Sequence, residues 1–171
     1  HIEAFDGLTG NLLWRVSLDE ILGPQQVAQS IRALSSPCRV PGGVVVVALR
    51  SEAGRLEAFG ALIKDGGEVA WVRHLGEATG STWLALRAAP ATPIEGVGTI
   101  HWSTDRGSII TFRTSDGAVE WIHELDGPSP TGLRDHLVEE RAAGVSLRRH
   151  GARLFASAPG SSRITILDAE S

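Results

Sequence analysis

A Gly-x-x-x-Trp-x-x-x-Leu pattern occurs three times in the 171 residues, and it constrains the fold more than any other feature of the sequence. The copies run over Gly10–Leu18, Gly67–Leu75 and Gly117–Leu125. Three of the five tryptophans of the chain occupy the fifth position of these copies. A pattern that returns in this way indicates a chain built from copies of one supersecondary unit.

The first copy and the residues before it predict a β-hairpin. Ala4 and Phe5 are expected to end a strand, and the Asp6 carboxylate is expected to accept backbone N–H groups and start a turn. Gly10 tolerates the positive φ that a tight turn requires. Leu12–Trp14 then begins the return strand, in which the large tryptophan ring can lie against a neighbouring sheet.

The spacing of the copies predicts a repeated four-stranded unit. Trp14 and Trp71 are 57 residues apart, and Trp71 and Trp121 are 50 apart, whereas a β-propeller blade takes roughly 40–50 residues. Short strands are expected before each turn, at Arg55–Phe59, Ser108–Phe112 and Arg163–Leu167, with Asp168 matching Asp6. A strand–turn–strand segment is expected upstream of each, at Ser35–Val47, Ala88–Trp102 and Gly144–Ala158.

We therefore expect an all-β chain that forms part of a β-propeller of four-stranded antiparallel blades. The expected parts are a blade end at 1–18, blades at 35–75 and 88–125, an insertion at 127–144 with a short helix over 133–142, and the start of a further blade at 145–171. Because a closed propeller needs at least about four blades, we expect the chain to be a fragment of a longer protein. An open array completed by oligomerisation is the alternative.

AFDGLTGNLLW (4–14) resembles the tryptophan-docking motif of quinoprotein-type, or PQQ-repeat, β-propellers, whose pattern is Ala-x-Asp-x-x-Thr-Gly-x-x-x-Trp. The first copy matches it at every fixed position. The third copy has Thr111, Arg113 and Asp116 at the first three positions, and the second has about three extra residues between Ala58 and the turn. The resemblance implies that each motif bridges adjacent blades. The docking residues expected on this basis are Ala4, Asp6, Thr9, Gly10, Trp14, Gly67, Trp71, Gly117 and Trp121.

Composition argues against several classes of function. The net charge is −4 and the isoelectric point is about 5.9, and the sequence has no basic stripe for a nucleic acid. No run of residues reaches the ~18 apolar residues of a membrane-spanning helix. Fifteen arginines stand against one lysine, and we read this as a bias of the genome.

Neither the histidines nor the cysteine predict a catalytic, metal or cofactor site. No two of the six histidines have His-x-His or His-x-x-x-His spacing, and we expect all of them on the surface or in loops. His74 and His123 should point to opposite faces of their strands. Cys38 is expected to be a buried, inert thiol beside the Pro37 bend. We therefore assign no catalytic, cofactor-binding or metal-binding residue.

Three functions remain open. The favoured one is a non-catalytic interaction scaffold within a larger protein or membrane-associated complex, with other protein subunits or the rest of the same propeller as partners and with no cofactor. The alternatives are a fragment of a PQQ- and calcium-dependent dehydrogenase, and an extracytoplasmic ligand- or stress-sensing domain. Similar propellers occur in outer-membrane assembly lipoproteins, in lumenal parts of endoplasmic-reticulum insertases and in stress-sensing kinases. The resemblance therefore implies an extracytoplasmic location, in the periplasm or the lumen of the secretory pathway.

Overall fold

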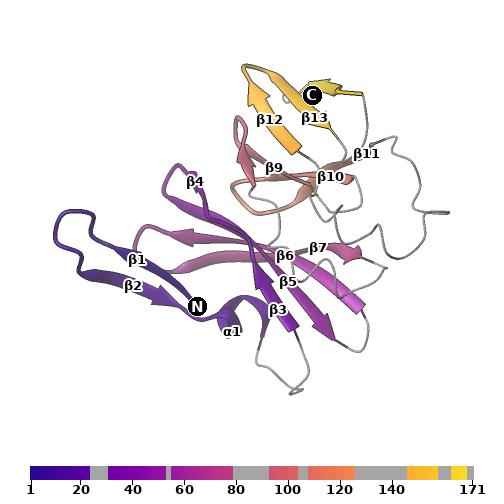
Figure 1. Ribbon diagram of the computed structural model, residues 1–171. Helices are drawn as coiled ribbons and strands as arrows, with labels where there is room; N and C mark the ends of the chain where they lie inside the picture. The colour runs from indigo at the N-terminus through magenta and orange to yellow at the C-terminus, as the bar shows by residue number, and fades with distance from the viewer. Residues whose placement is uncertain are drawn as a thin grey trace, which may run out of the picture.

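A computed structural model describes residues 1–23, 31–52, 55–78, 93–103, 108–125, 146–157 and 163–168. Within these ranges, antiparallel strands form four sheets and the single helix is five residues long. The predicted all-β chain of antiparallel sheets is thus confirmed. The predicted helix over 133–142 lies outside the described residues. Figure 1 shows the sheets following one another in chain order, from the indigo first hairpin to the yellow last sheet.

The first sheet is a two-stranded hairpin followed by a short helix. Strand β1 (Ile2–Phe5) pairs with β2 (Leu12–Val16), and α1 (Leu18–Leu22) follows directly. Sequence reasoning missed α1, although the signal was present. Ser17 accepts the backbone N–H of Asp19, and the Glu20 carboxylate accepts the backbone N–H of Ser17 at 2.8 Å, which makes a capping box.

The second sheet has the strand order β3-β5-β6-β7, and an extra strand, β4, also pairs with β5. These strands are β3 (Ile31–Leu34), β4 (Cys38–Val40), β5 (Gly43–Glu52), β6 (Arg55–Lys64) and β7 (Val69–Ala78). The strands β3 and β4 pair with opposite ends of β5, so together they occupy a single edge position. Ser35 joins them, because its N–H donates to the Val47 carbonyl and its hydroxyl accepts the Val47 N–H, both at 2.9 Å.

The third and fourth sheets continue the series. The third has the order β11-β10-β9-β8, made of β8 (Ile94–Glu95), β9 (Thr99–Ser103), β10 (Ser108–Arg113) and β11 (Val119–Glu124). The fourth has the order β12-β13-β14, made of β12 (Ser146–His150), β13 (Arg153–Ser157) and β14 (Thr165–Asp168). The three strands expected before the turns have other bounds. Strand β6 continues to Lys64, beyond the predicted end at Phe59, and β10 ends at Arg113, one residue beyond the predicted end. Strand β14 runs from Thr165 to Asp168 and not from Arg163 to Leu167.

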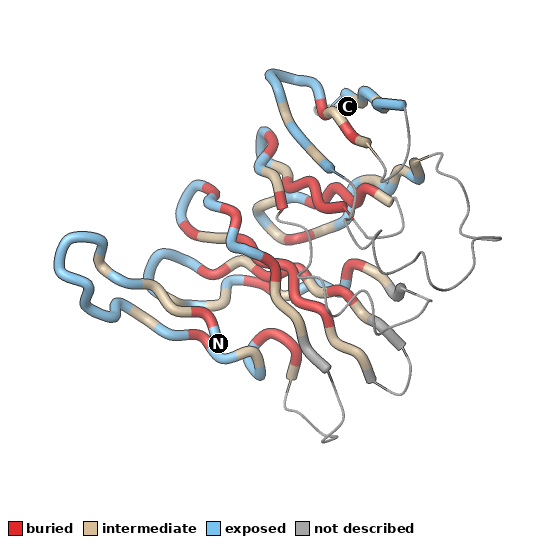
Figure 2. Tube along the Cα trace, in the orientation of Figure 1, coloured by how far each residue is buried: buried red, intermediate tan, exposed pale blue. Residues whose placement is uncertain are grey.

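Apolar cores lie between successive sheets, so the middle sheets are buried on both faces (Figure 2). Successive residues of a strand point to opposite faces. Accordingly, Val45 and Val47 belong to the core shared with the third sheet, whereas Val46 and Ala48 belong to the core shared with the first. Burial on both faces explains why β5 carries an unbroken apolar run.

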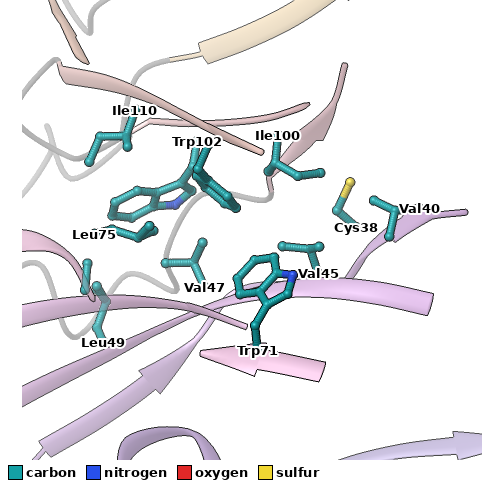
Figure 3. Packing of buried hydrophobic residues seen from close by; sticks show 12 residues of the cluster. Cys38, Val40, Val45, Val47, Leu49, Trp71, Leu75, Ile100, Trp102 and Ile110 are labelled. Atoms are coloured by element: carbon teal, nitrogen blue, oxygen red, sulfur yellow. The ribbon is translucent and has the colours of Figure 1, made fainter. Parts of the chain in front are cut away.

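The core between the second and third sheets is the largest and holds two tryptophans (Figure 3). Trp71 and Leu75 of β7 meet Ile100 and Trp102 of β9 there. Phe112 of β10 belongs to the same core and is fully buried. The Phe112 ring packs edge-on against Trp71, with the ring centroids 6.1 Å apart.

Replacing Phe112 with alanine should destabilise the protein by about 3–5 kcal/mol, because it removes a fully buried ring and leaves a cavity. The matched control is Phe5→Ala, since Phe5 is 55% exposed and its removal should change stability far less. Urea unfolding followed by tryptophan fluorescence measures both variants. Equal midpoints for the two variants would contradict the placement of the core.

Candidate functional site

The three glycine–tryptophan copies share one strand register at the tryptophan, and this register corrects one sequence alignment. Each tryptophan faces a residue on the preceding strand: Ala4 faces Trp14, Leu62 faces Trp71 and Thr111 faces Trp121. A β-bulge follows each of these three residues directly. Leu62, and not Ala58, therefore takes the place of Ala4, and the predicted three extra residues before the second turn were wrong. The second turn is instead one residue shorter.

Side chains of the first turn hold it closed as the sequence predicts. The Asp6 carboxylate accepts the backbone N–H groups of Leu8 at 3.0 Å and Thr9 at 2.7 Å. It also accepts the Thr9 hydroxyl at 2.9 Å. The backbone N–H of Thr9, followed by its hydroxyl, lowers the pKa of Asp6. Gly10 has the expected positive φ, 71°.

The third turn achieves the same shape with other residues. Asp116 accepts the backbone N–H of Ala118 at 3.0 Å and pairs with the Arg113 guanidinium at 2.9 Å. The Ala118 N–H, and then the Arg113 side chain, lower the pKa of Asp116. Gly117 has a φ of 71°, the same value as Gly10. The departures from the motif at Arg113 and Asp116 therefore leave the turn geometry intact.

Trp14 lies on the turn of the second sheet. Its indole N–H donates to the backbone carbonyl of Asp65 at 2.9 Å. A Cβ added to Gly67 would lie 2.7 Å from the Trp14 Cβ and 2.8 Å from its Cγ. Only a glycine fits this close approach, because Gly67 also has a φ of 86°.

Trp71 makes the equivalent contacts one sheet further along. Its indole N–H donates to the carbonyl of Thr114 at 2.9 Å. A Cβ added to Gly117 would lie 2.7 Å from the Trp71 ring. Asp65 and Thr114 each stand two or three residues before the glycine in their turns. One side-chain contact thus recurs between successive pairs of sheets.

Trp121 has a different environment within the described residues. It is half-buried, packs against the core between the third and fourth sheets, and its ring lies 5.9 Å from that of His101. Asp168, the expected match of Asp6, ends β14, and the residues after it lie outside the described part of the chain. The contact that Trp14 and Trp71 make is therefore described for two of the three tryptophans.

The expectation that every histidine is at the surface or in a loop was wrong for His101. It is fully buried in the middle of β9, on the face that points away from Trp102. His74 and His150 are exposed on their strands, and His136 lies outside the described residues. The signal in the sequence was the alternation in TIHWS (99–103), which places Thr99, His101 and Ser103 on one face of a buried strand.

His101 belongs to a polar cluster between the third and fourth sheets. Its Nδ1 lies 2.8 Å from the hydroxyl of Thr111, which is also buried. Arg149 of β12 approaches from the fourth sheet, and its guanidinium donates to the Glu95 carbonyl at 3.4 Å. Burial, and then the positive charge of Arg149, lower the pKa of His101 to about 4. The imidazole is therefore neutral at pH 7.

Cys38 has the environment that the sequence predicts. It is buried on β4 as a free thiol. Burial, and then the negative charge of Glu95, raise the pKa of the thiol. A thiol with a raised pKa is a poor nucleophile, since the thiolate is the reactive form. In the ranges that the structure describes, no group of three or more His, Cys, Asp and Glu side chains is arranged to hold a metal ion.

The family described as "Outer membrane protein assembly factor BamB" matches the chain over residues 1–171. The chain belongs to this family of PQQ-repeat β-propeller proteins. The family resemblance expected from the tryptophan motif is thus confirmed. No curated protein matches the chain.

Among solved structures, the chain is similar to BamB from Moraxella catarrhalis, with 16% sequence identity and a TM-score of 0.42. The match covers 85% of this chain and 49% of that one, so the chain spans about half the length of that relative. No helix in the described ranges of this BamB-family chain is long and apolar enough to cross a membrane.

A comparison of two glycines separates two costs of adding a Cβ: the steric clash with a neighbouring side chain and the strain of a positive φ. Gly117→Ala should destabilise the protein by roughly 1–3 kcal/mol more than Gly10→Ala, because the added methyl group overpacks the contact. Both glycines have a φ of 71°, but a Cβ at Gly10 meets nothing within 4 Å. Urea unfolding of both variants measures the difference.

A double-mutant cycle then tests the partner ring. In a Trp71→Ala background, the extra cost of Gly117→Ala should become smaller, because the ring is absent and the Cβ then meets only the flexible side chain of Arg73, whose Cγ also lies 2.7 Å away. An unchanged cost in that background would mean that Trp71 does not lie on Gly117.

The pKa of His101 predicts how stability depends on pH. The unfolded chain takes up a proton near the ordinary histidine pKa of 6.5, whereas the folded chain takes it up only near 4. Between these values the unfolded state binds more protons, so stability is complete above about pH 6.5 and falls as the pH decreases towards 4. His101→Gln should make the loss of stability between pH 7 and pH 4.5 smaller.

Urea unfolding of wild type and His101→Gln at pH 8, 7, 5.5 and 4.5 measures this effect. The two proteins should have the same pH dependence between pH 7 and 8. If their curves are also parallel down to pH 4.5, His101 is not the group responsible.

Proposed function

We propose that this chain is part of a non-catalytic β-propeller scaffold that takes part in assembling outer membrane proteins. The observation that carries the proposal is the match of the whole chain, residues 1–171, to the family of outer membrane protein assembly factor BamB. On this proposal the protein works outside the cytoplasm, in the periplasm, and needs no cofactor. Its partners are other protein subunits or further blades of the same propeller.

The first part of the proposal concerns the tryptophan contacts. We propose that the nine residues of the motif dock each blade onto the next one. The support is a contact that occurs twice: Trp14 lies on Gly67, and Trp71 lies on Gly117. In each case the indole N–H also donates to a backbone carbonyl of the turn that contains the glycine. These residues therefore build the platform and leave the binding of partners to other surfaces. The full set is Ala4, Asp6, Thr9, Gly10, Trp14, Gly67, Trp71, Gly117 and Trp121.

The second part concerns the surface that meets a partner subunit. The first hairpin carries exposed apolar side chains on its turn and on both faces, where Leu8 is 99% exposed at the turn and Leu13 is 61% exposed on β2. Phe5 and Leu12 lie on the same hairpin and are about half exposed. Apolar side chains that gather on a surface mark contact sites for other proteins. The rigid turn around Asp6 holds Leu8 in place.

Deleting the gene in the source organism should lower the amounts of folded outer membrane proteins, and the wild-type gene should restore them. A Leu8→Asp variant should restore them less well, because a charge at the turn disfavours burial against a partner. The control is Val97→Asp, since Val97 is 68% exposed on another turn, between β8 and β9. Immunoblots of the outer membrane fraction, with the level of each variant checked, measure the result.

Unchanged outer membrane proteins after deletion would contradict the scaffold proposal. Titration of the purified protein with PQQ and calcium then tests the dehydrogenase alternative, which predicts calcium-dependent quenching of tryptophan fluorescence. A membrane span or a kinase domain elsewhere in the full protein would favour the sensing alternative.

A further inference from the structure

Three polar atoms at the contact between the third and fourth sheets are buried without a hydrogen-bond partner in the described structure. They are Thr99 Oγ1, His101 Nε2 and Arg149 Nε. Leaving a buried donor or acceptor unpaired costs roughly 1–3 kcal/mol. Three such atoms in one region indicate a bound group that supplies the missing partners.

Two of these atoms lie beside one point of the β8–β9 turn. A Cβ added to Gly96 would lie 2.2 Å from Thr99 Oγ1 and 2.8 Å from His101 Nε2. The turn is fixed, because the Gly96 N–H donates to the Thr99 carbonyl at 2.7 Å. Only a glycine fits beside these two polar atoms, because a side chain at this position would strike both of them.

The third atom reaches the same turn from the fourth sheet. The Arg149 guanidinium donates through Nη1 to the carbonyl of Glu95, the residue before Gly96. Strand β12, which carries Arg149, also contacts β8 and β9, so Arg149 and His101 belong to the same contact between sheets. The cluster therefore joins β9 to β12 across the contact between two sheets.

Hydrogen-bond balance makes His101 Nε2 a donor. The Thr111 hydroxyl has one partner in the described structure, His101 Nδ1 at 2.8 Å, and a hydroxyl hydrogen needs an acceptor. If Thr111 donates to Nδ1, then the imidazole proton is on Nε2. The opposite tautomer would leave the buried Thr111 hydroxyl hydrogen unpaired as well, so it satisfies fewer groups.

All three unpaired atoms can then donate, and one of them carries charge. Arg149 Nε is only ever a donor, and the Thr99 hydroxyl donates freely. No carboxylate in the described ranges pairs with Arg149, since its one hydrogen bond is to the Glu95 carbonyl. A cation and neutral donors without an acidic partner create the field that suits an anion.

We propose that this cluster binds one small monovalent anion, of the size of a halide, between the third and fourth sheets. The anion accepts the N–H of Arg149 Nε, the N–H of His101 Nε2 and the hydroxyl hydrogen of Thr99. The close backbone of the Gly96 turn favours a single atom over a larger oxyanion. Binding ties the fourth sheet to the third, so the anion is a structural ligand of the stack.

Thermal unfolding in sodium bromide tests the proposal, with sodium nitrate of equal concentration as the reference salt, because nitrate has a bulk salt effect similar to that of bromide, whereas sulfate stabilises folded proteins in general. Saturating bromide should raise the unfolding midpoint of wild type by roughly 5 °C relative to nitrate. Thr99→Val and Arg149→Met should lose most of this rise, since each removes one donor. The matched control is Arg148→Met, which removes the same charge from an exposed neighbour on β12 and should keep the full rise.

Anomalous diffraction from crystals grown in sodium bromide locates the ion. A bromide peak in contact with Arg149 and His101, absent from crystals of Thr99→Val, supports the proposal. An ordered water alone at that point would overturn it, as would an equal bromide response in Thr99→Val and wild type. Because Thr99→Val keeps the size of the side chain, this variant tests the site even if Arg149→Met does not fold.

Discussion

An indole side chain packed against a glycine in the turn of the next sheet is the contact that recurs between these sheets. The contact combines two constraints in one place. The indole N–H needs an acceptor and finds the carbonyl of Asp65 or Thr114, while the ring needs a surface without a Cβ. Gly67 and Gly117 supply that surface, and their positive φ closes the turn. One residue type therefore serves both the turn and the contact between sheets.

The apolar cores extend from these contacts. Trp71 touches the turn at Gly117, and its ring also packs against Phe112 inside the largest core of the described chain. The middle strand β5 then has no solvent-facing side, which accounts for its continuous valines. Helix α1 completes the first contact by burying Ile21 and Leu22 in the core that Val46 shares with the first sheet.

The contact between the third and fourth sheets uses different chemistry. Where the other contacts place aliphatic side chains on the central strand, β9 presents Thr99, His101 and Ser103 to the fourth sheet. Among the residues that the structure describes, Ile109, Leu154 and Ala156 form the buried apolar part of that core. A polar layer has demanding geometry, because each buried donor needs an acceptor. The proposed anion supplies that acceptor. The stability of this contact would then depend on a bound ion, unlike that of the other contacts.

The sequence by itself determined the elements that local chemistry controls. Asp6 and Gly10 specify a turn through backbone hydrogen bonds and a positive φ, and the spacing of the three tryptophans specifies a repeated β unit. The family followed from the same residues. Two local features were not predicted correctly. Helix α1 was not predicted, although Ser17 and Glu20 form its capping box. In the second turn, Leu62 and not Ala58 faces the tryptophan.

Only the tertiary structure decided what each face of a strand meets. The sequence places His101 between Ile100 and Trp102, but a period of two does not say whether the other face is covered. The fourth sheet covers it, and Arg149, nearly fifty residues later, comes to the turn at Gly96. The burial of His101 and the charge near it depend on residues from distant parts of the sequence, so no local pattern could predict them.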